Sequence, residues 1–125
     1  MNKKETGHIY EDKAADYLEE KGFIVLERNF RCRQGEIDIV GLHENCLVFV
    51  EVKYRKNVSA GAPEEAVGIA KQAKICMVSD YYRIIHPQCE GRQIRYDVVA
   101  ICGEQITWYR NAFPYHRKGG GSASW

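Results

Sequence analysis

The chain has 125 residues, of which 45% are hydrophobic, and a formal net charge of +1. This length is enough for one domain with a buried core and too short for two. The low net charge excludes a polycationic nucleic-acid-binding protein, and apolar runs no longer than a strand exclude a membrane-spanning helix. The N-terminus is polar and has no apolar signal segment, so the cytoplasm is the expected location.

The first half of the chain predicts one helix and three strands. The helix is expected over residues 5–21 and ends at Gly22. Its stripe of small and apolar residues contains one carboxylate, Glu11. Glu11 is a buried hydrogen-bond acceptor, a boundary residue that reaches solvent, or a member of a site. The strands, which are rich in β-branched and apolar residues, follow over residues 23–31, 36–41 and 47–53.

The second and third strands form a hairpin that gathers charged side chains. A tight turn at residues 44–45 places Asp38 opposite Glu51 and Glu36 opposite Lys53. Alternate residues share a face, so these four side chains are expected on one side of the hairpin. A cross-strand ion-pair set on an exposed face would be the ordinary explanation, but here two carboxylates converge beside one lysine. The opposite face is expected to carry an apolar row, made of Ile37, Ile39, Val48, Val50 and Val52.

The second half predicts a helix and two strands. Pro63 is a typical first-turn residue, and the helix must end before Pro87. Its apolar residues at helical spacing are Ala66, Ile69, Ala70, Ala73, Cys76, Met77 and Tyr81, and its other face carries Lys71, Gln72 and Lys74. The strands cover residues 94–101 and 105–109. One domain over residues 1–117 is therefore expected, with a disordered tail over residues 118–125.

The ligand chemistry of the chain favours oxygen. Its five cysteines and four histidines are scattered, which fits neither a disulfide framework nor a zinc motif. Carboxylates suit Mg²⁺ or Mn²⁺. Basic residues flank the hairpin and form either a phosphate-attracting rim or an ordinary mixed-sign surface; they are Arg28, Arg31, Arg33, Lys53, Arg55 and Lys56.

This α-β-β-β-α-β-β order, with Glu11 on the first helix, Asp38 on the second strand and Glu51-x-Lys53 on the third, resembles the restriction-endonuclease-like PD-(D/E)xK nuclease superfamily. One departure is that Ile37, not proline, precedes Asp38. Over about residues 7–113 the chain more closely resembles the bacterial YraN family (UPF0102) of endonuclease-like proteins. The matching segments are Gly7-x-x-x-Glu11-x-x-Ala14, Arg28-Asn29-Phe30-Arg31, Gly35-Glu36-Ile37-Asp38, Phe49-Val50-Glu51-Val52-Lys53-x-Arg55, Lys71-Gln72, Tyr96-Asp97-Val98-Val99-Ala100-Ile101 and Asn111-Ala112-Phe113.

The resemblance implies an α/β fold with an α-β-β-β-α-β core, a mixed sheet flanked by helices. It also implies catalytic roles for Glu11, Asp38, Glu51 and Lys53. Asp38, Glu51 and the Val52 carbonyl would hold Mg²⁺ or Mn²⁺, and Glu11 would bind a second ion or its waters from the helix side. Lys53 would orient the attacking water and stabilise charge on the phosphoryl oxygens, with Glu36 holding Lys53 in place. The expected nucleic-acid contacts are Arg31, Arg33, Arg55, Lys56, Lys71 and Gln72.

Two functions follow from this reading. The first is a metal-dependent endonuclease on DNA, structure-specific like the Holliday-junction resolvases and working as a homodimer. The second is a catalytically inactive nucleic-acid-binding or scaffold protein that keeps the nuclease fold. The intact acidic set favours the enzyme, whereas the low net charge favours a protein that needs a partner to reach its substrate.

Overall fold

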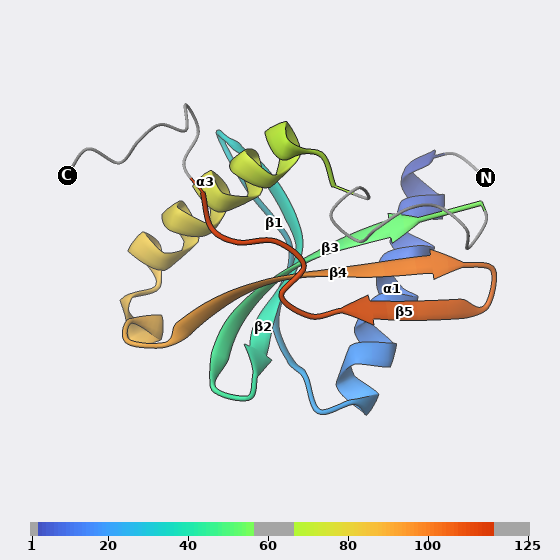
Figure 1. Ribbon diagram of the computed structural model, residues 1–125, viewed down its shortest axis with the longest axis horizontal. Coiled ribbons are helices and arrows are strands. Elements are labelled where there is room, and N and C mark those ends of the chain that lie inside the picture. Colours follow the sequence, from blue (N-terminus) through green and yellow to red (C-terminus); the bar gives the residue numbers. More distant parts are fainter. Residues whose placement is uncertain (1–2, 57–66, 117–125) are drawn as a thin grey trace.

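The computed structural model describes residues 3–56 and 67–116, which form a mixed sheet with helices packed on both faces (Figure 1). The strand order is β1-β2-β3-β4-β5, and only β3 and β4 run parallel among the neighbours. The elements are α1 (Lys3–Glu20), β1 (Ile24–Cys32), β2 (Gly35–His43), β3 (Cys46–Tyr54), α3 (Ile69–Ile85), a 3₁₀ turn (Pro87–Cys89), β4 (Gln93–Cys102) and β5 (Gln105–Tyr109). The predicted α/β class and element order are confirmed, and the arrangement is consistent with a restriction-endonuclease-like core.

The hairpin of β2 and β3 has the predicted register. Its turn residues Glu44 and Asn45 have positive φ angles of 50° and 67°, which a two-residue turn between twisted strands requires. Pairing runs from the turn as far as Ile39 opposite Val50. Beyond that pair the strands separate, and the Val52 N–H donates a hydrogen bond to the Asp38 carboxylate (2.8 Å). A side chain therefore replaces the backbone ladder at this position.

The sheet separates two hydrophobic clusters, one against each helix. Ala14, Ala15 and Leu18 of α1 pack on the first face, and the second face packs against the α3 residues Ile75, Cys76, Val78 and Tyr82. Burial of each large aliphatic side chain contributes about 1.5–3 kcal/mol. Sheet residues on the α1 side are Ile39, Val48, Val50, Val99 and Ile101, and those on the α3 side include Ile37, Val40, Leu47 and Phe49.

The predicted single apolar row is therefore wrong at one residue. Ile37 packs on the α3 side, whereas Ile39 packs on the α1 side with Val48 and Val50. Residues two apart in a regular strand share a face, so the alternation of β2 is interrupted at Asp38. This irregularity coincides with the end of the β2–β3 ladder.

The second helix differs from its prediction. Pro63 lies outside the described residues, and α3 begins at Ile69, because Gly68 is extended (φ −64°, ψ 163°). The predicted apolar face is also wrong in part, since Ile69 is 73% exposed and Tyr81 is 42% exposed. Gln72 and Ser79 are buried instead. Ser79 is satisfied by hydrogen bonds with the Cys76 carbonyl and the Tyr96 hydroxyl, so polar residues occupy the buried face.

Across residues 3–56 and 67–116, neither helix has the length and apolarity needed to cross a bilayer. The predicted tail over residues 118–125 lies outside the described residues.

Candidate functional site

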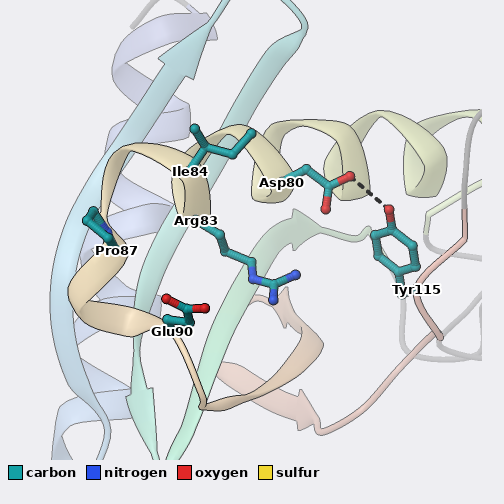
Figure 2. A pocket seen from close by; sticks show the side chains of 6 residues that line it. All are labelled: Asp80, Arg83, Ile84, Pro87, Glu90 and Tyr115. Atoms are coloured by element: carbon teal, nitrogen blue, oxygen red, sulfur yellow. Dashed lines mark hydrogen bonds between the residues drawn. The ribbon is translucent and has the colours of Figure 1, made fainter.

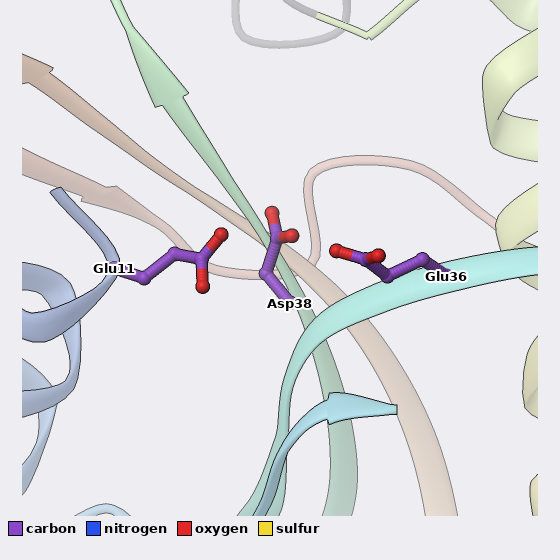
Figure 3. A group of neighbouring side chains, drawn as sticks. All are labelled: Glu11, Glu36 and Asp38. Atoms are coloured by element: carbon purple, nitrogen blue, oxygen red, sulfur yellow. The ribbon is translucent and has the colours of Figure 1, made fainter. Parts of the chain in front are cut away.

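Three carboxylates converge where β2 departs from regular geometry. Glu11 comes from α1, and Glu36 and Asp38 come from β2; one oxygen from each lies within 4.8 Å of the others. Figure 3 shows the three side chains directed toward one another. Sequence reasoning placed Glu36 beside Lys53, but the Glu36 Oε2 atom instead accepts a hydrogen bond from Nε of Arg31 on β1 (2.6 Å). The structure thus adds Glu36 to the carboxylate cluster.

Asp38 is at the centre of this cluster. Its carboxyl accepts the Val52 N–H and is hydrogen-bonded to the side chain of Glu51. Burial is the main cause that raises the pKa of Asp38 to about 8, and the neighbouring charges of Glu51 and Glu36 add to it, against the lowering effect of the Val52 N–H. In the metal-free protein Asp38 therefore holds a proton at neutral pH.

Glu11 is placed beside Asp38 rather than in bulk solvent. Its side chain is 14% exposed, and burial followed by the charge of Asp38 raises its pKa, while a hydrogen bond from Asn29 opposes the rise. The Oε1 atom is buried and has no hydrogen-bond partner among the described residues; His8 Nδ1 is 3.9 Å away. A buried carboxylate oxygen without a hydrogen-bond partner raises the free energy of the folded protein. A bound cation would satisfy it.

Glu51 extends the site to the other side of the sheet. It is 9% exposed, and its Oε2 atom lies 3.8 Å from Nζ of Lys71 at the start of α3. Because Glu51 also contacts Asp38, the site joins the two faces through the gap where β2 and β3 separate. Lys53 is exposed, and its ammonium makes no ion pair or hydrogen bond within the described part of the chain. The expected Glu36–Lys53 pair is therefore absent there.

The predicted nucleic-acid contacts fall into different environments. Arg33 and Lys56 are exposed, Arg55 is half-buried, and Arg31 is engaged with Glu36. Gln72 was expected on the helix surface, and this is wrong. It is 3% exposed, its amide donates to a backbone carbonyl in the preceding segment (2.8 Å), and its Oε1 atom lies 3.1 Å from a histidine ring nitrogen. Its position favours support of α3 over contact with a phosphate.

A hollow of about 590 Å³ lies beside the C-terminal half of α3 (Figure 2). Its lining residues are Asp80, Arg83, Ile84, Pro87, Glu90 and Tyr115. The Tyr115 hydroxyl donates a hydrogen bond to Asp80 Oδ2 (2.8 Å) across it. This hollow contains none of the clustered carboxylates.

Residues 10–101 match the model of the uncharacterised protein family UPF0102. The chain belongs to this family. A UPF0102 protein of Lachnoclostridium phytofermentans is 50% identical over 113 residues, which cover 90% of this chain and 96% of that protein. UPF0102 proteins of Caldanaerobacter subterraneus and Cytophaga hutchinsonii are 44% and 43% identical over 81% and 85% of this chain, and over 82% and 92% of their own lengths. The matched UPF0102 region contains the whole carboxylate cluster.

Proposed function

We propose that this UPF0102 protein is a metal-dependent nuclease that hydrolyses phosphodiester bonds in nucleic acid, with DNA as its substrate. The observation that carries the proposal is the buried, unpartnered Oε1 atom of Glu11 within a group of three carboxylates whose oxygens lie within 4.8 Å. Glu51 joins this group through Asp38. Like charges at this spacing raise the free energy of the folded protein unless protons or a cation compensate them.

The donor set fits a hard divalent ion. All of the clustered ligand atoms are carboxylate oxygens, which Mg²⁺ and Mn²⁺ prefer over the nitrogen and sulfur ligands typical of zinc. Asp38 would be the central ligand because it touches both Glu51 and the Glu11 side of the cluster. Glu51, Glu11 and the Val52 carbonyl would supply further oxygens, and Glu36 is an additional candidate from the structure.

When bound, Mg²⁺ or Mn²⁺ would offset charge on the phosphate and favour ionisation of a water molecule. In the hydrolysis, the water oxygen forms a bond to phosphorus, one phosphorus–oxygen ester bond breaks, the water loses a proton and the leaving oxygen gains one. Glu11 would hold the ion through Oε1, which has no hydrogen-bond partner among the described residues, and the proton of the water would pass to the surrounding solvent.

The second candidate is a nucleic-acid-binding or scaffold protein without turnover. A scaffold role is favoured because two arginines of the basic rim pair with the protein's own carboxylates: Arg28 with Asp12 and Arg31 with Glu36, both at 2.6 Å. Such pairing leaves fewer cations for a phosphate backbone.

A cleavage assay separates the two functions. Duplex, single-stranded and four-way-junction DNA, with matched RNA, are incubated with Mg²⁺ or Mn²⁺ and with wild type, Asp38→Asn or Glu51→Gln. We expect cleavage by wild type and a loss of at least ~10²-fold in either variant, with Asp16→Asn on the exposed face of α1 as the matched control. Metal binding without cleavage of any substrate would favour the scaffold function, and undiminished cleavage by Asp38→Asn would refute the site.

Oligomeric state is tested in the same preparation. We expect a homodimer, since one small domain offers little surface for two strands of a branched substrate. Sedimentation with and without DNA measures this.

A further inference from the structure

We propose that Lys71 of α3, rather than Lys53 of β3, supplies the positive charge that contacts the scissile phosphate. The inference rests on the proposed nuclease function and names the cation of its site. Lys71 Nζ lies 3.8 Å from the buried Oε2 of Glu51, which is hydrogen-bonded to Asp38. No other lysine among the described residues has an ion pair with a carboxylate of the site.

The position of Lys71 at the start of α3 adds to its effect. The helix begins at Ile69, and the preceding Gly68 provides no side-chain cap. No acidic residue lies in the first turn. The backbone N–H groups of this turn carry the positive end of the helix dipole, so charge and dipole act in the same direction. A phosphate oxygen near Glu51 would meet both.

Contacts of the buried Gln72 side chain anchor the first turn of α3. Gln72, next in the chain, is 3% exposed, and its amide donates to the Val67 carbonyl while its Oε1 atom lies 3.1 Å from His116 Nε2. These contacts fix the backbone from which Lys71 projects. The Lys71 side chain itself is 50% exposed, so its ammonium bridges the buried carboxylate and the solvent from which a substrate arrives.

The ion pair with Glu51 leaves Lys71 free to bind a further group. At 3.8 Å the contact is longer than a hydrogen bond, and an ammonium has three donors. A non-bridging phosphate oxygen can therefore bind Lys71 without displacing Glu51. Lys53, by contrast, is exposed, and no ion pair or hydrogen bond within the described part of the chain orients its ammonium toward the carboxylates.

The test compares Lys71→Ala, Lys71→Arg and Lys53→Ala with the control Lys74→Ala, a neighbouring exposed lysine on α3. Calorimetry measures the affinity for Mn²⁺ and then the affinity of the Mn²⁺-loaded protein for inorganic phosphate. Single-turnover cleavage is measured on whichever DNA the wild type cleaves. Circular dichroism of each variant verifies the fold.

In Lys71→Ala we expect Mn²⁺ affinity within about threefold of wild type and phosphate affinity at least about tenfold weaker, because one charge-assisted hydrogen bond is lost. Cleavage should fall by ~10²–10³-fold. Lys71→Arg should recover part of the phosphate affinity, since the charge is kept. Lys74→Ala should stay within about threefold in every measurement, and Lys53→Ala should keep its phosphate affinity within about threefold of wild type.

Unchanged phosphate affinity in Lys71→Ala would overturn the assignment while leaving the nuclease proposal in place. A larger loss of phosphate affinity in Lys53→Ala than in Lys71→Ala would do the same. A wild type that binds no Mn²⁺ would overturn the nuclease proposal and this inference together. If wild type binds phosphate, this binding depends on Lys71 and no substrate is cleaved, the assignment of Lys71 is supported and the result favours the scaffold function.

Discussion

The raised pKa of Asp38 predicts an unusual dependence of stability on pH. Burial and the charges of Glu51 and Glu36 raise this pKa from the ordinary 3.8 to about 8 in the metal-free protein. Below about pH 4 the carboxyl is protonated in both the folded and the unfolded chain. Between about pH 4 and 8 the unfolded chain releases the proton and the folded protein retains it. The folded protein is therefore destabilised progressively as the pH rises through this window.

The variant Asp38→Asn isolates this effect. Asparagine has the shape of a protonated aspartic acid, can still accept the Val52 N–H, and can donate to Glu51. One proton held only by the folded state gives a slope of ~1.4 kcal/mol per pH unit. Lowering the pH from about 7.5 to 5.5 should therefore stabilise wild type relative to Asp38→Asn by roughly 2–3 kcal/mol.

Urea denaturation in a buffer that contains a chelator and no divalent ions, followed by tryptophan fluorescence, gives the free energy of unfolding at each pH. Wild type and Asp38→Asn are compared at constant ionic strength, so that groups common to both proteins cancel. Parallel curves of stability against pH would mean that Asp38 ionises normally, and would refute the reasoning that places it in a crowded, buried carboxylate group.

Three further predictions concern the metal and the fold. At Mg²⁺ or Mn²⁺ concentrations of about 100 times the dissociation constant, wild type should gain ~2.7 kcal/mol of stability and Asp38→Asn little; equal shifts in thermal melts would place the metal elsewhere. Gly41→Ala should lower the free energy of unfolding, measured by urea denaturation, by about 3 kcal/mol, because the added Cβ would overlap a buried aromatic ring and a backbone carbonyl. In the control Gly68→Ala the added Cβ meets open space, so the free energy of unfolding should change little. Asp97→Asn should lower the free energy of unfolding by about 3–5 kcal/mol, since Asp97 is fully buried and its carboxylate neutralises Arg95 on the same strand. A loss of stability below about 1 kcal/mol would contradict this.

Local signals in the sequence determined the hairpin that carries the site. A two-residue turn at residues 44–45, flanked by β-branched residues, predicts the register that pairs Ile39 with Val50. Turn chemistry and side-chain alternation act over a few residues, so they can be read without knowledge of the rest of the fold. The order of helices and strands followed from the same kind of signal, whereas the expectation that Glu11 belongs near Asp38 came from the resemblance to a known family.

Only the tertiary structure decided how the site is assembled. The ladder ends beside Asp38, Ile37 and Ile39 turn to opposite faces, and Glu36 pairs with Arg31 on the neighbouring strand. The lysine beside Glu51 comes from α3, and α3 buries a face with polar members that its apolar pattern did not reveal. These features depend on how helices distant in sequence pack against the two faces of the sheet, and the free energy of that packing outweighs local periodicity.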